Sequence, residues 1–135
     1  MKTLKRWWPA ALWAAIIFVL CSIPGKDIPS AGWMHAVSLD KWVHFIMFAV
    51  LSILVLHALR RSSGRDEYWP FQWWWIGVVV LYGALTEGYQ HWFLEDRYAD
   101  VFDFVANTLG AFVGTWVYHR YHHLYYRRVE SGKTF

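Results

Sequence analysis

The chain has 135 residues and a net charge of +3, and 57% of its residues are hydrophobic whereas only 17% are charged. Soluble domains carry about 25% charged residues, and the polar stretches of this chain are too short to form a separate soluble domain. The composition therefore excludes an ordinary soluble globular protein and favours a membrane protein.

The first apolar segment, at about residues 7–23, follows a basic start and could be mistaken for a secretory signal peptide. It contains no small-x-small cleavage site, and Cys21 follows Leu20 rather than a small residue, which argues against a lipoprotein attachment site. We therefore interpret the segment as a membrane-spanning helix. Cys21 is the single cysteine, so it forms no internal disulfide, and we expect it to be a small buried apolar residue.

Three more apolar segments follow, at about residues 42–59, 71–90 and 101–118. All four have close to the roughly 17 to 25 residues with which a helix spans a bilayer. Between them lie stretches that are typical of loops, "IPGKDIPSAGW", "RRSSGRDEYWP" and "LEDRYAD". We predict a single-domain, all-α integral membrane four-helix bundle, in which residues 119–135 form a basic tail.

The distribution of Lys and Arg predicts the orientation of the bundle, because basic residues are retained on the cytoplasmic side of a membrane. Of the 13 Lys and Arg, ten lie in the two termini and the second loop, and three (Lys26, Lys41 and Arg97) lie on the other side. Both termini should therefore face the cytoplasm. The basic face would meet anionic lipid headgroups, so the net charge does not indicate a nucleic acid partner.

Ionisable residues recur at one depth of the predicted bundle. His44 lies three residues after Lys41 near the start of the second span, Glu87 lies three residues before the end of the third, and Asp103 lies three residues after Asp100 opens the fourth. At about 1.5 Å per helical residue, these side chains lie roughly 4 to 5 Å beneath the outer boundary. Intramembrane ionisable residues usually mark a functional site.

The fourth span carries these groups on one continuous face with glycines below them. At 100° per residue, one seam contains Asp100, Asp103, Asn107, Gly110 and Gly114. The Gly-x-x-x-Gly spacing permits close helix contact, so we expect this seam to face the interior of the bundle.

Two interpretations of the carboxylates stay open. Asp100 and Asp103 suit the positive start of a helix and could simply cap it. Glu87 lies at the unfavourable negative end of its helix and needs a partner such as Lys41 or Arg97. The residues therefore form either a structural ion-pair cluster or a ligand-binding or catalytic pocket.

The ordered set of motifs resembles the VanZ-like family over about residues 22–118. The motifs are Asp40-Lys41-x-x-His44-Phe45-x-x-Phe48, Glu87-x-x-Gln90, Arg97 and Asp100-x-x-Asp103-x-x-x-Asn107-x-x-Gly110-x-x-x-Gly114. The resemblance implies a small bacterial membrane protein. The family is named for a member associated with low-level resistance to teicoplanin, a lipoglycopeptide that binds peptidoglycan precursors.

We predict an outward-facing polar pocket that binds or modifies a lipid-linked or lipid-bearing envelope molecule, reached laterally from the outer leaflet. The candidate acids and bases are Glu87, Asp103 and His44. The candidate substrate-binding residues are Asp40, Lys41, Gln90, Arg97, Asp100 and Asn107. Lys41 and Arg97 could hold a phosphate or carboxylate. Whether turnover occurs stays open, and the expected partners are membrane lipids with such a precursor or lipoglycopeptide.

Two other functions, and a metal site, are alternatives to this pocket. A transporter needs polar groups across the membrane, and below the cluster no ionisable side chain occurs until His57 and His119. An interaction or assembly protein with a structural ion-pair cluster is the main alternative. A metal site built from His44, Glu87, His91 and Asp103 lacks a diagnostic spacing, so neither a metal nor another cofactor is predicted.

Overall fold

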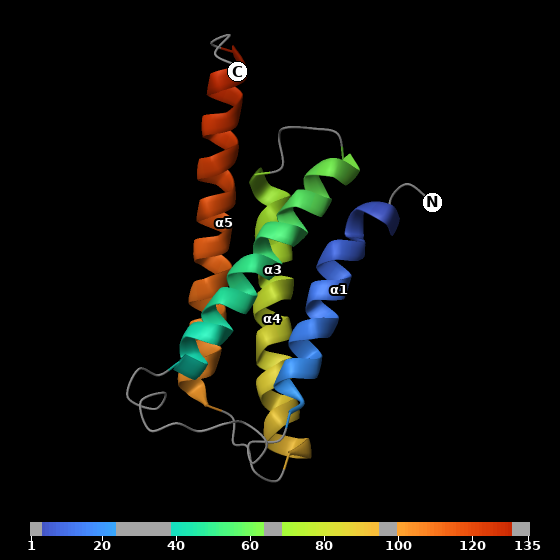
Figure 1. The fold of residues 1–135 in the computed structure, drawn as a ribbon, viewed down its shortest axis with the longest axis vertical. Helices are drawn as coiled ribbons and strands as arrows, with labels where there is room; N and C mark the ends of the chain where they lie inside the picture. The colour runs from blue at the N-terminus through green and yellow to red at the C-terminus, as the bar shows by residue number, and fades with distance from the viewer. Residues whose placement is uncertain (1–3, 24–38, 64–68, 95–99, 131–135) are drawn as a thin grey trace.

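The computed structural model consists of four helices in its described residues, with no strand there, which confirms the all-α prediction (Figure 1). The structure describes residues 4–23, 39–63, 69–94 and 100–130. The helices are α1 (Leu4–Cys21), α3 (Leu39–Ser63), α4 (Trp69–Phe93) and α5 (Val101–Glu130).

Successive helices run in opposite directions, so that the start of α1 and the end of α5 lie toward the same end of the bundle (Figure 1). We call that end, where α3 finishes and α4 begins, the basic end, because Arg6, Arg60 and Arg61 lie there. The opposite end, where α4 finishes and α3 and α5 begin, contains Asp40, Asp100 and other carboxylates and is called the acidic end.

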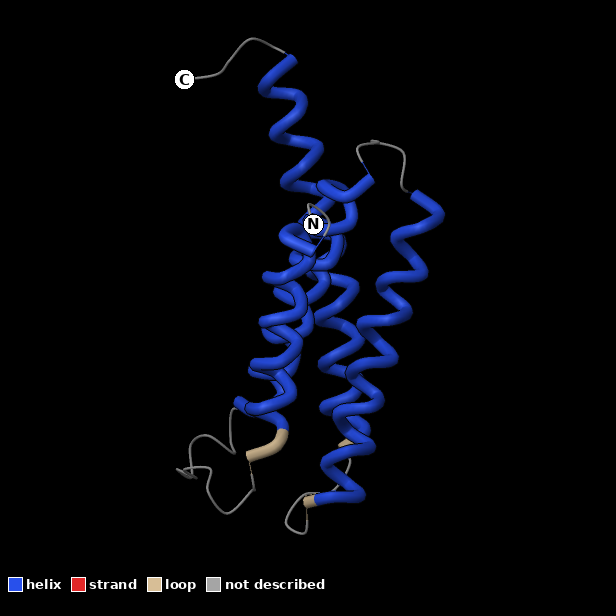
Figure 2. Tube along the Cα trace, turned by 90° about the vertical axis from the view of Figure 1, so that its right-hand side faces the viewer, coloured by secondary structure: helices blue, strands red, loops and turns tan. Residues whose placement is uncertain are grey.

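Each helix covers one of the predicted apolar segments, but the boundaries differ. The largest difference is in α5, which has 30 residues and continues as helix to Glu130, where a tail had been predicted from residue 119. The apolar run ends near Tyr118, but Tyr, His and Arg can extend a helix that has already been nucleated, so the predicted basic tail begins as helix. Figure 2 shows this extension of α5 beyond the other helices.

Length and apolarity identify α3 as a candidate membrane span, over Leu39–Ser62, and no other helix in the described part of the chain meets the same criterion. The other helices are interrupted by aromatic and polar residues, for example Trp73, Trp74 and Trp75 in α4. The four-span arrangement and the orientation of the termini therefore stay predictions.

The glycine seam of α5 packs directly against the backbone of α3, as expected from its spacing. A Cβ atom added at Gly110 would overlap the carbonyl oxygen of Phe45, and one added at Gly114 would overlap that of Ala49. The backbones are thus too close for any side chain. This contact fixes the spacing of the two helices that begin at the acidic end.

Side-chain hydrogen bonds to backbone carbonyls attach α1 to its neighbours. The indole Nε1 of Trp13 donates to the carbonyl of Met47 in α3 (3.0 Å), and the hydroxyl of Tyr82 in α4 donates to the carbonyl of Ala14 (2.7 Å). Trp13 and Tyr82 therefore act between helices rather than at an interface with headgroups.

Several polar side chains are buried in the bundle, and many large apolar side chains are exposed on its surface. This distribution is unlike that of a water-soluble protein. The buried polar or charged residues are His44, Ser52, Gln72, Thr86, Glu87, Gln90, Asp103, Asn107 and Thr115. Large apolar side chains are exposed on every helix, including Leu12, Ile46, Trp74, Leu85 and Trp116. The polar interior is concentrated at the acidic end.

Candidate functional site

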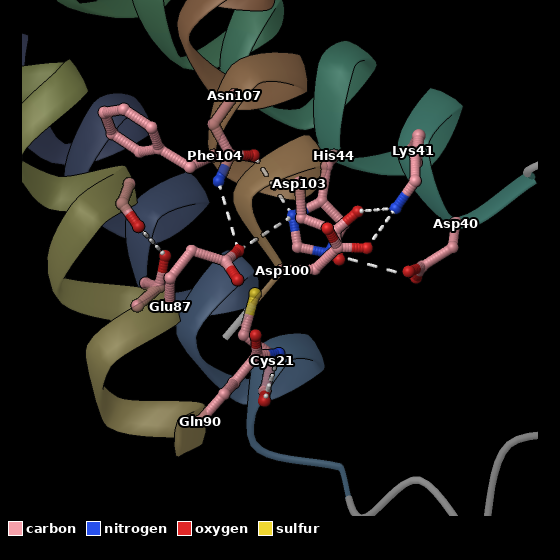
Figure 3. A network of polar contacts seen from close by, with 12 residues as sticks. Cys21, Asp40, Lys41, His44, Glu87, Gln90, Asp100, Asp103, Phe104 and Asn107 are labelled. Atoms are coloured by element: carbon pink, nitrogen blue, oxygen red, sulfur yellow. Dashed lines mark hydrogen bonds and ion pairs between the residues drawn. The ribbon is translucent and has the colours of Figure 1, made fainter. Parts of the chain in front are cut away.

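Seven of the nine predicted site residues come together at the acidic end, where three helices meet (Figure 3). Helix α3 contributes three of them, α4 contributes one, and α5 with the residue before it contributes three. This group, called the acidic-end network, consists of Asp40, Lys41, His44, Glu87, Asp100, Asp103 and Asn107.

Lys41 joins α3 to the start of α5 through two carboxylates. Its Nζ lies 2.5 Å from Oδ2 of Asp100 and 2.8 Å from Oδ1 of Asp103. The side chains of Lys41 and Asp100 are 32% and 39% exposed, whereas that of Asp103 is only 8% exposed. The ion pair therefore extends from the surface into the bundle.

Asp100 both caps α5 and binds Lys41, so the two roles that the sequence left open coexist. Its Oδ1 accepts a hydrogen bond from the backbone N–H of Phe102 (2.8 Å), as an N-cap residue does. Its Oδ2 is the atom that faces Lys41. The hydrogen bond from Lys41, helped by that from Phe102, holds the pKa of Asp100 below its ordinary value.

A second branch of the network lies deeper and connects all three helices. Nδ1 of His44 lies 3.1 Å from Oδ1 of Asn107, and Nδ2 of Asn107 donates to Oε1 of Glu87 at 3.4 Å. Nδ1 of His44 is also 3.7 Å from the same Glu87 oxygen. Because the Asn107 amide presents its oxygen to the ring, the Nδ1 of His44 carries the hydrogen.

The partner of Glu87 differs from the one expected. Of the two partners that the sequence suggests, Lys41 is paired with Asp100 and Asp103, and Arg97 lies outside the described residues. The described partners of Glu87 are Asn107 and His44. Helix direction alone could not reveal this, because the pairing depends on where α3 and α5 cross. The other oxygen of Glu87, Oε2, is buried and has no hydrogen-bond partner in the described structure.

Asp40 lies at the rim of the network, and its side chain is 57% exposed. It is one helical turn before His44, and its Oδ1 is 3.9 Å from Nε2 of the ring. The imidazole is therefore flanked by carboxylates on both sides, with Glu87 toward Nδ1 and Asp40 toward Nε2.

The two remaining predicted residues do not join this group. Gln90 is buried, and its Nε2 donates to the carbonyl of Cys21 at 3.0 Å, so it holds the end of α1 against α4. Cys21 itself is buried, as expected. Arg97 lies outside the described residues.

Sequence reasoning missed the contribution of Gly83 to the site. A Cβ atom there would lie 3.2 Å from Cβ of Asn107 and 3.1 Å from the ring of Phe48. Such contacts are tighter than ordinary packing, so the absence of a side chain brings α4 close to Asn107. The signal that could have identified it is a glycine four residues, or about one helical turn, before Glu87.

The network contains the kinds of side chain from which acid–base pairs and ion-binding sites are built. Glu87 and Asp103 are buried carboxylates beside an imidazole, the combination from which acid–base pairs are built. One ligand atom from each of Asp40, His44 and Asp103 lies within 4.8 Å of the others, a spacing that could hold a metal ion. This set differs from the one considered from the sequence, and His91 is exposed at the end of α4.

The comparisons with known proteins agree with the motif pattern. No curated protein and no solved structure matches the chain. A family model described as VanZ/LLP1 matches residues 2–123, a region that includes every residue of the acidic-end network. This match covers most of the sequence and confirms the resemblance, and the chain therefore belongs to the VanZ/LLP1 family.

Proposed function

We propose that this protein is a multi-pass membrane protein whose acidic end faces outward and binds or modifies a lipid-linked or lipid-bearing envelope molecule. The observation that carries the proposal is the combination of a partly open, charged network with an apolar exterior. Family membership supports a membrane location, and α3 has the length and apolarity to cross a bilayer.

The distribution of exposed aromatic residues supports insertion of the whole bundle. Trp42 and Trp92 are 57% and 78% exposed and lie near the acidic end, whereas Trp8, Trp74 and Trp116 are exposed toward the other end. Two belts of Trp are typical of the two membrane interfaces. Exposed Leu and Val between the belts would contact lipid rather than water.

The entrance to the network suits a molecule with an anionic headgroup and an apolar chain. Lys41 is the accessible cation, and Asp100, its more exposed partner, is the carboxylate that an incoming phosphate would displace. Phe102 is 68% exposed, and its ring centroid lies 5.8 Å from Nζ of Lys41. An acyl or prenyl chain could lie along Phe102 while its headgroup binds Lys41 and Arg97.

The deeper branch supplies the groups for proton transfer if the bound molecule is modified. His44 and Glu87 lie 3.7 Å apart. Asp103 has a ligand atom within 4.8 Å of one on His44 and contacts the ammonium of Lys41 at 2.8 Å. In this scheme Lys41 positions the anion, and His44, Glu87 and Asp103 act as acid and base.

The main alternative is an assembly protein in which the network only stabilises the bundle. The double ion pair of Lys41 favours it, because Asp100 and Asp103 already share a positively charged partner without a ligand. A transporter is less well supported, since the buried polar residues between the network and the basic end in α3 and α5 are the neutral Ser52 and Thr115.

Lipid analysis of the purified protein separates binding from assembly. The protein would be extracted in native lipid, and co-purifying lipids would be identified by mass spectrometry for wild type, Asp103→Asn and His57→Gln. We expect a prenyl phosphate or glycolipid to be enriched in wild type and lost in Asp103→Asn, which keeps the shape of the side chain but removes its charge.

His57→Gln is the matched control, because His57 is exposed on α3 and far along the helix from His44. It should retain the enriched lipid. Identical lipid profiles in all three proteins, or loss of folded Asp103→Asn protein from the membrane, would instead support the assembly function. A buried pair that loses one partner typically costs about 3 to 5 kcal/mol.

A further inference from the structure

We infer that the rim of the acidic-end network binds one divalent transition-metal cation through Asp40, His44 and Asp103. The three residues each offer a ligand atom, and these atoms lie within 4.8 Å of one another. Two of them, Asp40 and His44, are one turn apart on α3, and Asp103 faces them from α5. The ion would therefore connect the two helices that pack most closely at their glycine seam.

The hydrogen-bonding of His44 prepares its Nε2 as a metal ligand. Nδ2 of Asn107 is directed to Glu87, so Oδ1 of Asn107 faces His44 and accepts the hydrogen on Nδ1 of the ring. In a neutral imidazole the other nitrogen, Nε2 of His44, then has a free lone pair. A hydrogen bond that fixes the other ring nitrogen is the usual companion of a metal-binding histidine. Glu87, buried and 3.7 Å from Nδ1, reinforces this orientation.

The separation between Nε2 of His44 and Oδ1 of Asp40 fits a shared cation better than a hydrogen bond. The 3.9 Å distance exceeds the roughly 3.2 Å upper limit of a normal N–H···O bond. Two ligand atoms that are each about 2.0 to 2.2 Å from one ion lie about 3 to 4 Å apart. Two acceptors that face each other need either a proton or a cation between them.

Charge balance also favours a cation. The network holds four carboxylates, whereas Lys41 is its one permanently positive group among the described residues. Lys41 already binds Oδ1 of Asp103, which leaves the second oxygen of that carboxylate for the ion. One imidazole and two carboxylates form a mixed nitrogen and oxygen set, which suits Mn²⁺ or Zn²⁺ better than Mg²⁺.

A cation at this place would strengthen the attraction of the entrance for an anionic headgroup, because it would lie beside Lys41. That role rests on the proposed function, whereas the binding of the metal does not. The two ideas can therefore fail separately.

The test is a metal titration of the full-length protein in detergent without added envelope lipid. After treatment with EDTA and dialysis, MnCl₂ or ZnCl₂ would be added, and bound metal would be counted by plasma mass spectrometry and binding followed by the thermal midpoint. We expect one ion per chain. Asp40→Asn should weaken binding by at least about 10- to 100-fold, the loss that follows mutation of residues that only support a metal ligand. The metal-free midpoint should stay the same because Asp40 is exposed.

His91→Gln is the control, because it removes an exposed histidine near the same end and should bind metal as wild type does. The inference is overturned if wild type binds no ion, if Asp40→Asn binds as well as wild type, or if MgCl₂ binds as tightly as MnCl₂. Metal binding without lipid enrichment would uphold this site and refute the proposed function. Lipid enrichment in a protein that binds no metal would do the reverse.

Discussion

His44 and His57 lie on the same helix, α3, and differ in almost every respect. His44 is buried at the acidic end and is held between Asn107, Glu87 and Asp40. His57 is exposed toward the basic end. Residue type therefore does not distinguish a candidate functional histidine here. The distinction comes from the side chains of neighbouring helices that surround it.

The two ends of the bundle extend this contrast. At the acidic end, carboxylates from three helices converge on Lys41 and His44. At the basic end, Arg6 donates to the carbonyl of Arg61 and Arg60 contacts the ring of His122, so cationic side chains bind backbone and imidazole groups. The first arrangement brings ionisable groups together, whereas the second suits contact with anionic headgroups.

The largest expected effect concerns the sides of the membrane on which the two ends lie. Single cysteines at Ala31 and Ser63, introduced in a Cys21→Ser background, should react oppositely with an impermeant thiol reagent in intact cells. Ala31 should be labelled and Ser63 protected, because α3 separates them. Equal labelling of both sites would contradict the proposed orientation.

The next largest effect is expected at the glycine seam between the two ends. Gly114→Ala should lower the thermal midpoint or the membrane abundance, because its Cβ would overlap the backbone of Ala49. Overpacking of this kind costs about 1 to 3 kcal/mol. Gly77→Ala is the matched control, since no atom lies within 4 Å of the added Cβ there. A fall of similar size in both variants would show that the seam is not a close contact.

A smaller effect is expected on the antibiotic sensitivity of cells. Its measurement tests whether the acidic end carries the proposed function. Expression in a susceptible Gram-positive host should change sensitivity to teicoplanin more than to vancomycin, which lacks an acyl chain. Glu87→Gln and Arg97→Ala should each abolish the difference, whereas His119→Ala, toward the basic end, should not. Growth inhibition is the measurement. Full retention of the effect in Glu87→Gln would rule out Glu87 as a site residue.

The smallest effect concerns the ion pair at the mouth of the network. Because the pKa of Asp100 is lowered in the folded protein, its stabilisation is present above the ordinary value of 3.8 and is lost as pH falls through the lower folded value. Asp100→Asn keeps an N-cap side chain but loses the charge. Its free energy of unfolding should therefore be slightly lower than that of wild type at neutral pH, by under about 1 kcal/mol.

This difference should begin to shrink as pH falls below 3.8 and should disappear below the lower pKa of Asp100 in the folded protein. Thermal unfolding in detergent across the pH range measures it. A constant gap at all pH values would mean that the charge of Asp100 contributes nothing and that the amide disturbs the cap instead.

The helices were predictable because each coincides with an apolar run, and the glycine seam was predictable because its spacing places both glycines on one face. The partner of Glu87 was not, since it depends on the rotation of α3 and α5 about their contact. Gln90 was misleading for a similar reason: it shares a face with Glu87, but the end of α1 lies beside it and accepts its hydrogen bond. Sequence spacing determines which residues share a helix face, whereas pairing across helices requires their relative placement.

Asn107 has a further consequence for the chemistry of the acidic end. Its amide lies between the imidazole of His44 and the carboxylate of Glu87, and it is fully buried itself. An amide neither gains nor loses a proton in the physiological range. Asn107 can therefore hold the imidazole of His44 and the carboxylate of Glu87 at a fixed separation through hydrogen bonds that do not depend on a change in its own charge.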